Sequence, residues 1–400
     1  MVISVYNIKP QEEIKMKGKF KKIIALVLVL IVVIGAVSVG VIYNKKKLRS
    51  ITLDKTSISI KTGEKVKLTA TLEPLDTNNT EVKWMSVTDK TIAIVSQDGT
   101  VTAGGPGIAT IVCESVDRPE ISASCQVCVT SEPPKVSAEN ALVYNIDTGN
   151  VIMTKKTDSK IAPASLAKIL TASVALKYAK ADDVFTVGSE LKLVMPGSSI
   201  CQIREGFKLS LQDLICGMLV SSGNDAAYTI AANIARKESG SNMTDKAAIE
   251  HFCGLMNAYA KEIGMTNSNF TSPDGWDDDE QYTTAADLAI LTRNAISIPE
   301  IKEVVAYDSK HVTFASGQHI TWSNTNLMLH KDSDFYNEYV TGFKTGSTTK
   351  AGKCLISTYE SSEESTAGNF VIVVLGCDSD AQRYEDTEKL IKWARENKHA

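Results

Sequence analysis

The chain has 400 residues, of which 43% are hydrophobic and 22% are charged, enough for two or three domains with hydrophobic cores. Its formal net charge of −4 gives no electrostatic basis for binding nucleic acid, so no nucleic-acid partner is expected. The first informative segment is residues 23–43, which carry no charge and would span a bilayer core as a helix.

Basic residues flank this apolar run on both sides. Six lysines precede it, and three lysines and an arginine follow it within residues 45–49. The pattern predicts a cytoplasmic basic segment over residues 1–22, a single-pass membrane anchor over 23–43, and an extracellular remainder. A cleaved signal that ends at the small residues 36–38 is the alternative, and it would make the protein secreted.

Residues 50–130 have the pattern of an all-β domain. Apolar residues alternate with polar ones from Val66 to Leu72, and further short apolar runs follow at 82–84, 92–95, 109–113 and 122–129. Glycine-rich turns separate these runs, which predicts a small sandwich. The stretches ITLDKTSISIKTGEKVKLTATLEP and VKWMSVTDKTIAIVSQDGTVTAGGPGIATI resemble a group 2 bacterial immunoglobulin-like domain. That resemblance implies a surface spacer or a wall-adhesion module.

Residues 131–137 contain two prolines and are interpreted as a linker to a domain over residues 138–400. Strands are predicted at 141–146 and 151–154, and helices near 165–179, 210–221, 224–237 and 246–263. Strands at 340–345, 353–358 and 369–376 precede a last helix over 381–396. This order predicts an α+β domain in which a mixed sheet joins both ends of the domain and a helical cluster lies beside it.

The first candidate chemical motif is Ser165-Leu-Ala-Lys168, which opens an apolar helix. At positions i and i+3, the serine and the lysine share one helix face. Burial disfavours the charged form of a lysine, so the neutral amine can accept the serine proton. A helix-start serine followed by a lysine that reaches toward solvent is the structural alternative.

Two further motifs follow in order, Ser222-Gly-Asn224 and Lys344-Thr-Gly346. A turn between buried helices would present a hydroxyl and an amide, and a strand edge would present a cation, a hydroxyl and a glycine. A helix cap and an exposed hairpin end are the alternatives. Other copies of these patterns occur at Ser189–Lys192, Ser347–Lys350 and Lys61–Gly63, so only the ordered trio is informative.

Residues 138–397 resemble the serine-type D-alanyl-D-alanine carboxypeptidases, which are low-molecular-mass penicillin-binding proteins with a β-lactamase/transpeptidase-like fold. The strings that carry the resemblance are APASLAKILTA, MLVSSGNDAAYTIA, MTNSNFTSPDGWDDDEQYTTAADLAIL, VTGFKTGSTTKAGKCLIS and FVIVVLG. It implies that Ser165 is the nucleophile, Lys168 its base and Ser222 a proton relay. The implied substrate-binding residues are Asn224, Lys344, Thr345 and Gly346, and the implied oxyanion hole consists of the backbone N–H groups of Ser165 and Ser347.

The resemblance also implies an activity and its partners. The expected reaction is hydrolysis of the terminal D-Ala-D-Ala bond of a peptidoglycan pentapeptide through an acyl-enzyme on Ser165. β-Lactams are expected to acylate the same serine, and no cofactor or metal is expected. A DD-endopeptidase, a serine β-lactamase and a catalytically silent wall-binding protein are the alternatives. The chain has no Leu-Asn dipeptide, which argues against the class A β-lactamase pattern Glu-x-x-Leu-Asn.

Overall fold

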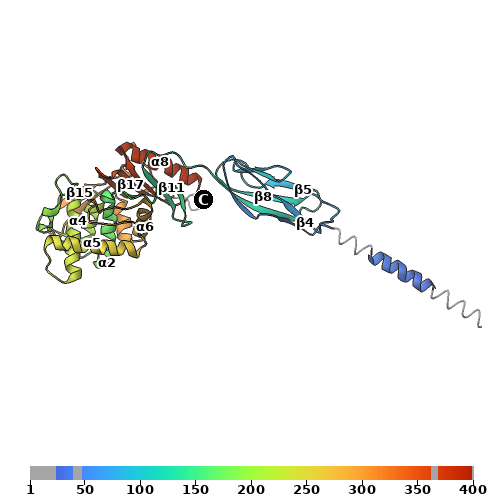
Figure 1. Ribbon diagram of the computed structural model, residues 1–400, viewed down its shortest axis with the longest axis horizontal. Coiled ribbons are helices and arrows are strands. Elements are labelled where there is room, and N and C mark those ends of the chain that lie inside the picture. Colours follow the sequence, from blue (N-terminus) through green and yellow to red (C-terminus); the bar gives the residue numbers. More distant parts are fainter. Residues whose placement is uncertain (1–23, 39–46, 362–367, 399–400) are drawn as a thin grey trace, which may run out of the picture. The chain divides into compact units, whose positions relative to one another are not determined.

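The computed structural model describes residues 24–38, 47–361 and 368–398 (Figure 1). The chain divides into two compact units, Met1–Val129 and Thr130–Ala400. The basic segment expected over residues 1–22 lies outside the described residues.

The transmembrane helix expected over residues 23–43 is not supported. Only residues 24–38 of that range are described, and they are helical. No helix in the described part of the chain is both long enough and apolar enough to cross a membrane.

The first unit contains three antiparallel sheets, with strand orders β2-β9-β8-β5, β3-β7-β6 and β1-β4. Its strands are β1 (Ser50–Leu53), β2 (Ser57–Lys61), β3 (Lys65–Lys67), β4 (Ala70–Glu73), β5 (Val82–Ser86), β6 (Ala93–Val95), β7 (Thr100–Ala103), β8 (Gly107–Ser115) and β9 (Ser122–Thr130). Trp84, Val101 and Ile111 belong to its single apolar core, so the expected all-β sandwich is found.

The alternating run that begins at Val66 forms two strands rather than one. β3 pairs with β7, whereas β4 pairs with β1. Between them, the Leu68 N–H donates to the carbonyl of Gly99, and the Leu68 side chain is buried in the core. The alternation therefore marks the buried face correctly but does not reveal the change of partner strand.

The second unit is built on a five-stranded antiparallel sheet with the order β11-β10-β18-β17-β16. The sheet thus pairs strands from both ends of the domain, as predicted, although it is wholly antiparallel rather than mixed. Its strands are β10 (Asn140–Asn145), β11 (Val151–Lys155), β16 (Val340–Thr348), β17 (Gly352–Tyr359) and β18 (Phe370–Cys377). Two hairpin-like pairs lie apart from it: β12 (Val184–Thr186) with β13 (Lys208–Ser210), and β14 (Ser309–Thr313) with β15 (His319–Ser323).

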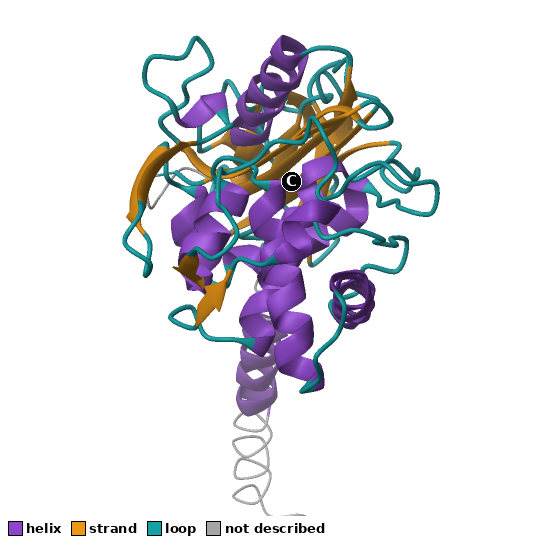
Figure 2. Cartoon of the chain, turned by 90° about the vertical axis from the view of Figure 1, so that its left-hand side faces the viewer, coloured by secondary structure: helices purple, strands orange, loops and turns teal. Residues whose placement is uncertain are grey.

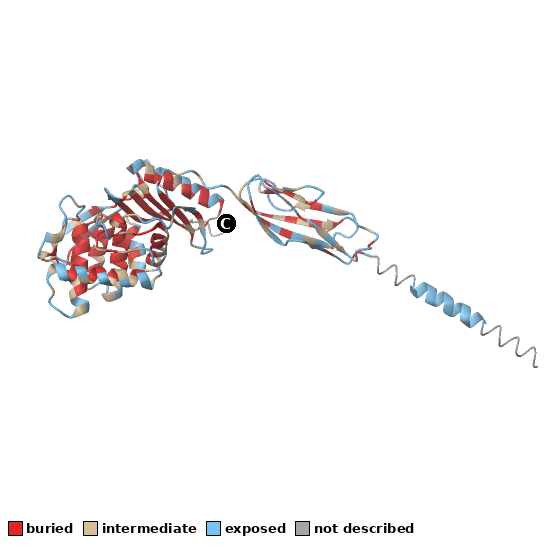
Figure 3. Ribbon diagram, viewed as in Figure 1, coloured by how far each residue is buried: buried red, intermediate tan, exposed pale blue. Residues whose placement is uncertain are grey.

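Helices pack on both faces of this sheet (Figure 2). They are α2 (Ala167–Tyr178), α3 (Leu211–Leu219), α4 (Asn224–Ser239), α5 (Asp245–Glu262), α6 (Ala285–Ile296), α7 (Pro299–Val305) and α8 (Asp380–Glu396), with the 3₁₀ turns η1 (Ala164–Leu166), η2 (Ser189–Leu193) and η3 (Leu327–Leu329). α8 and one sheet face share a core that includes Tyr359 and Tyr384. The larger core, between the other face and the helical cluster, is buried almost throughout (Figure 3). α2 runs through this core, which places the Ser165–Lys168 motif at its start.

Candidate active site

Ser165 lies in the 3₁₀ turn η1, immediately before α2. The preceding residue, Ala164, has a φ of +47°, a left-handed conformation that is costly for a residue with a Cβ atom. Ala164 and Leu166 are fully buried, but Ser165 is partly exposed. The strained entry therefore presents the Ser165 hydroxyl next to a helix whose first nine residues are buried.

Lys168 is completely buried, and its ammonium nitrogen lies 2.7 Å from the Ser165 hydroxyl oxygen. The same nitrogen donates a hydrogen bond of 3.1 Å to the backbone carbonyl of Asp274. Burial lowers the Lys168 pKa to about 8, against the opposing effect of the Asp274 and Asp225 carboxylates. About a tenth of this amine is thus neutral at pH 7, against far less for an ordinary lysine, and it lies within reach of the serine proton.

Ser222 lies in the turn between α3 and α4, and it is the second strained residue of the site, with a φ of +61°. The turn is held because the N–H of Gly223 donates to the carbonyl of Gly217, and the N–H of Asn224 to that of Ser199. The Ser222 side chain is largely buried, and its hydroxyl has no hydrogen-bond partner within the described chain. It is therefore free to bond a ligand.

Asn224 begins α4, and its side-chain amide donates a 2.6 Å hydrogen bond to the Asp274 carboxylate. Asp274 is buried, and its other carboxylate oxygen accepts from the N–H of Trp276. Since its backbone carbonyl also accepts from Lys168, Asp274 connects two of the three motifs. It was not among the predicted site residues.

The Asp225 carboxylate joins the start of α4, next to the Ser222 turn, to the segment of Cys201. It accepts hydrogen bonds from the N–H groups of Cys201 at 2.8 Å, Ile203 at 3.2 Å and Ala226 at 3.0 Å. Burial, reinforced by the nearby Asp225 charge, raises the pKa of the Cys201 thiol well above its usual value. Asp225 lies within the string SGNDAA but was not among the predicted site residues.

Lys344, Thr345 and Gly346 lie on β16, the edge strand of the sheet. The Lys344 side chain is buried, and its nitrogen donates to the backbone carbonyl of Thr345 at 3.1 Å. Burial and the positive charges of Lys168 and Arg383 hold the Lys344 pKa well below its ordinary value. No hydrogen bond joins Lys344 to Ser222 in the described chain.

Thr345 has a partner that the sequence did not indicate. Its hydroxyl lies 2.5 Å from the hydroxyl of Thr325, in the segment that follows β15. The carbonyl of Thr325 in turn accepts from the Tyr384 hydroxyl of α8. Arg383 of α8 donates to the carbonyls of Gly346 and Cys354, so it bridges β16 and β17 beside the motif.

Two glycines allow the segments of the site to meet at Ala164. A Cβ atom on Gly275, whose φ is +87°, would lie 1.7 Å from the carbonyl oxygen of Ala164. A Cβ atom on Gly346 would lie 3.1 Å from that of Ala164. The turn that carries Ser165 is therefore packed between the loop of Asp274 and β16, next to Ser347.

The stray motif copies have other contacts. The Ser189 hydroxyl donates to Asp245 at 2.6 Å, and the Lys350 ammonium pairs with Asp279. In the third copy, Lys61 ends β2, and the next two residues lie in the turn that leads to β3. Among the three Ser-x-x-Lys copies, a hydrogen bond between the serine hydroxyl and the lysine nitrogen is found at Ser165–Lys168 alone.

This fold and this arrangement of serine, lysine and strand edge are those of a serine acyltransferase with a lysine base. The family described as D-alanyl-D-alanine carboxypeptidase matches residues 127–379, and the chain belongs to that family. Residues 47–115 match the bacterial Ig-like domain of group 2.

Individual relatives agree with this assignment. The D-alanyl-D-alanine carboxypeptidase DacC of Escherichia coli is 34% identical over 276 residues, which cover 66% of this chain and 62% of the relative. The D-alanyl-D-alanine carboxypeptidase of Streptomyces strain K15 is 29% identical over 65% of this chain and 88% of that protein. The solved Streptomyces K15 DD-transpeptidase superposes with a TM-score of 0.59 at 27% identity, covering 66% of this chain and 98% of the other. The chain spans less than two thirds of the length of DacC.

Proposed function

We propose that the protein is a serine DD-carboxypeptidase that removes the terminal D-alanine from peptidoglycan stem peptides. The observation that carries the proposal is the 2.7 Å contact between the Ser165 hydroxyl and the buried Lys168 amine. The family membership and the named activity of relatives such as DacC support it.

The first half of the reaction forms an acyl-enzyme. Neutral Lys168 takes the Ser165 proton as the serine oxygen attacks the carbonyl carbon of the penultimate D-alanine. The backbone N–H groups of Ser165 and Ser347 bind the developing oxyanion, a contribution typically worth about 3–4 kcal/mol per donor. Ser222 passes the proton to the amine of the departing D-alanine. Water then attacks the ester and restores Ser165.

Substrate orientation is assigned to the remaining motif residues. Asn224 binds the amide of the substrate backbone, and its orientation is fixed by the hydrogen bond to Asp274. Lys344 and Thr345 bind the terminal carboxylate of an extended peptide at the open edge of β16, and Gly346 lets the turn of Ser165 pack against that strand. A carboxylate favours the charged form of Lys344, which burial otherwise disfavours.

Labelling and hydrolysis test the proposal together. The protein should bind a fluorescent penicillin covalently and should release D-alanine from a pentapeptide that ends in D-Ala-D-Ala. Ser165→Ala should abolish both, whereas Ser189→Ala, which changes a stray copy of the motif, should keep both. Labelling that survives in Ser165→Ala would contradict the nucleophile assignment.

The same experiment separates the alternatives. Penicillin labelling without D-alanine release, but with cleavage of a cross-linked peptide dimer, indicates a DD-endopeptidase. Rapid turnover of penicillin indicates a β-lactamase, and neither label nor release indicates a silent wall-binding protein. Because the solved Streptomyces protein is named a transpeptidase, one arm includes a D-amino acid as acceptor. Amine attack in place of water then gives an exchanged peptide.

The proposed location is outside the cytoplasmic membrane. The sequence supports it, because the uncharged run of residues 23–43 with basic flanks is typical of an export segment. The immunoglobulin-like unit is proposed to act as a spacer or wall-adhesion module. Sequencing the N-terminus of the mature protein tests the export segment: an intact N-terminus excludes cleavage after residue 38, and detection in the cytoplasm alone overturns the location.

A further inference from the structure

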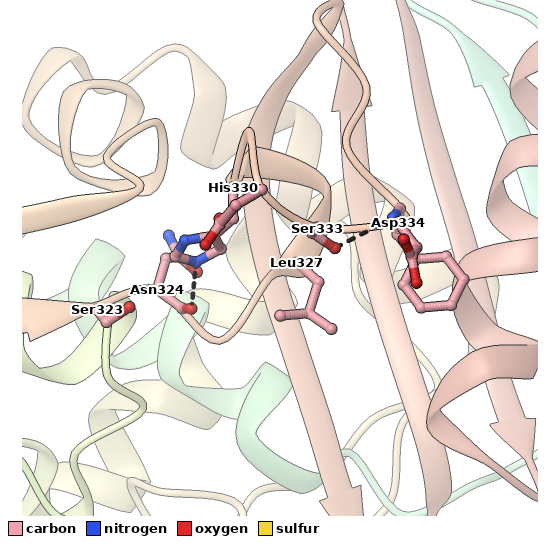
Figure 4. A pocket seen from close by; sticks show the side chains of 8 residues that line it. Ser323, Asn324, Leu327, His330, Ser333 and Asp334 are labelled. Carbon is pink, nitrogen blue, oxygen red and sulfur yellow. Dashed lines mark hydrogen bonds between the residues drawn. The ribbon is translucent and has the colours of Figure 1, made fainter.

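A pocket opens beside the proposed carboxylate site. It has a volume of about 450 Å³ and is formed by the end of β15 and the segment that leads to β16 (Figure 4). It is lined by Ser323, Asn324, Leu327, His330, Asp332, Ser333, Asp334 and Phe335. None of these residues has a role in the mechanism above, and the volume is within the range of small-ligand pockets.

The position of the pocket follows from Thr325. Its hydroxyl contacts that of Thr345, and the two residues before it line the pocket. The proposed oxyanion donor Ser347 lies two residues further along β16 than Thr345, which is about 6–7 Å in a strand. The pocket therefore adjoins the carboxylate end of the site, where the terminal residue of the substrate would lie, rather than the scissile carbonyl.

The lining has a definite chemistry. Asp332 and Asp334 are exposed carboxylates, and neither has an ion-pair partner in the described chain. His330 is oriented by a 2.8 Å hydrogen bond from its Nε2 atom to the carbonyl of Asn324. In Figure 4, the Leu327 side chain lies between Asn324 and Asp334 and provides an apolar surface. The described lining includes neither lysine nor arginine.

We propose that this pocket is a subsite for the side chain of the leaving D-amino acid and that it favours a long cationic side chain over an anionic one. The apolar Leu327 and Phe335 contact the aliphatic stem, and the two carboxylates attract the ammonium head. The enzyme would then trim stem peptides that end in a basic D-amino acid as well as those that end in D-alanine. The inference rests on the proposed function, because it takes Lys344 and Thr345 as the carboxylate site.

Four pentapeptides that differ only in the last residue test it: D-alanine, D-lysine, D-norleucine and D-glutamate. We expect kcat/KM to be higher for D-lysine than for uncharged D-norleucine, and lowest for D-glutamate. The double variant Asp332→Asn/Asp334→Asn should lower the D-lysine to D-norleucine ratio roughly fivefold, the scale of an exposed ion pair. Release of D-alanine should stay unchanged, and added salt should weaken the wild-type preference.

Glu338→Gln is the matched control, because Glu338 is an exposed acid three positions beyond Phe335 in the sequence and does not line the pocket. Equal rates for D-lysine and D-glutamate, or a ratio that the double variant leaves unchanged, would overturn the subsite. The D-alanine peptide alone reports on the proposed function. If it is not hydrolysed, the subsite is decided by whether the D-lysine peptide competes better than the D-glutamate peptide against penicillin labelling.

Discussion

Lys168 and Asp274 are 106 residues apart in the sequence, yet the buried lysine donates a 3.1 Å hydrogen bond to the aspartate's backbone carbonyl. The Asp274 carboxylate also acts on Lys168 through its charge and raises the pKa that burial lowers. One loop residue thus both positions the proposed base and limits how far its pKa falls. Two consequences for the pH dependence follow.

The rate of acylation by penicillin should rise with pH and level off above the Lys168 pKa of about 8. The rate rises with pH because the neutral Lys168 amine is the proton acceptor, and the neutral fraction grows as the pH passes through the Lys168 pKa. Stopped-flow measurement of acylation between pH 6 and 10, in protein shown to remain folded, checks it. A rate that falls across this range would contradict Lys168 as the base.

Asp274→Asn should move that rise to lower pH. Removing the negative charge leaves the desolvation of Lys168 less opposed, so its pKa falls further. The new side-chain oxygen can still accept from Asn224, which limits the structural change. Asp279→Asn is the control: this exposed acid of the same loop pairs with Lys350, so its loss should leave the profile in place.

Binding of a ligand with a free carboxylate should be accompanied by proton uptake at Lys344. Its pKa is held low by burial and by two neighbouring positive charges, and an anion in contact with it favours protonation. Calorimetry of a D-Ala-D-Ala ligand on Ser165→Ala, in buffers of different ionisation enthalpy at a series of pH values below the ordinary lysine pKa, measures the uptake. A C-terminally amidated ligand is the control and should show none. Equal proton uptake for both ligands would contradict the prediction, because the uptake would then not depend on the ligand's carboxylate.

The sequence predicted the contacts that depend on short spacing. Ser165 and Lys168 meet because they are three positions apart in the sequence, where η1 leads directly into α2. The helices α2, α3, α4 and α5 begin within two residues of their predicted starts. Asp274 and Thr325 could not be found in this way. Their partners are distant in the sequence, and an isolated aspartate or threonine in a loop has no periodic pattern that predicts its neighbours.

Local sequence and pairing explain the bounds of two other elements. The helix α6 begins after Thr284, whose hydroxyl accepts from the N–H of Asp287, a standard N-cap. β16 extends through Gly346 to Thr348 rather than ending near residue 345, because its pairing with β17 continues past the glycine. In the pairing of β8 with β9, Cys113 lies opposite Ala123 rather than Cys125, and all eight cysteines are free thiols.

Asp225→Asn should destabilise the domain and slow acylation. An amide cannot accept from all three backbone N–H groups that the carboxylate now satisfies, and a buried unsatisfied donor costs about 1–3 kcal/mol. Urea unfolding gives the free energy, and penicillin labelling of the folded fraction gives the rate. Glu205→Gln, at an exposed turn, should change neither. Unchanged acylation in Asp225→Asn would show that the position of the Ser222 turn does not depend on this carboxylate.

Gly275→Ala should impair both stability and acylation, and Gly264→Ala separates the two physical causes. Both glycines have positive φ, at +87° and +98°, so an alanine at either position costs about 1–2 kcal/mol in backbone strain. Only at Gly275 would the added Cβ atom collide with the carbonyl of Ala164; no atom lies within 4 Å of the corresponding position at Gly264.

Gly275→Ala must therefore displace the turn that carries Ser165. We expect its penicillin acylation rate to fall by at least tenfold, which corresponds to about 1.4 kcal/mol in the barrier. Gly264→Ala should lose stability alone and keep its acylation rate, as measured on the folded fraction. If the two variants acylate at equal rates, the packing of Gly275 against Ala164 does not position the nucleophile.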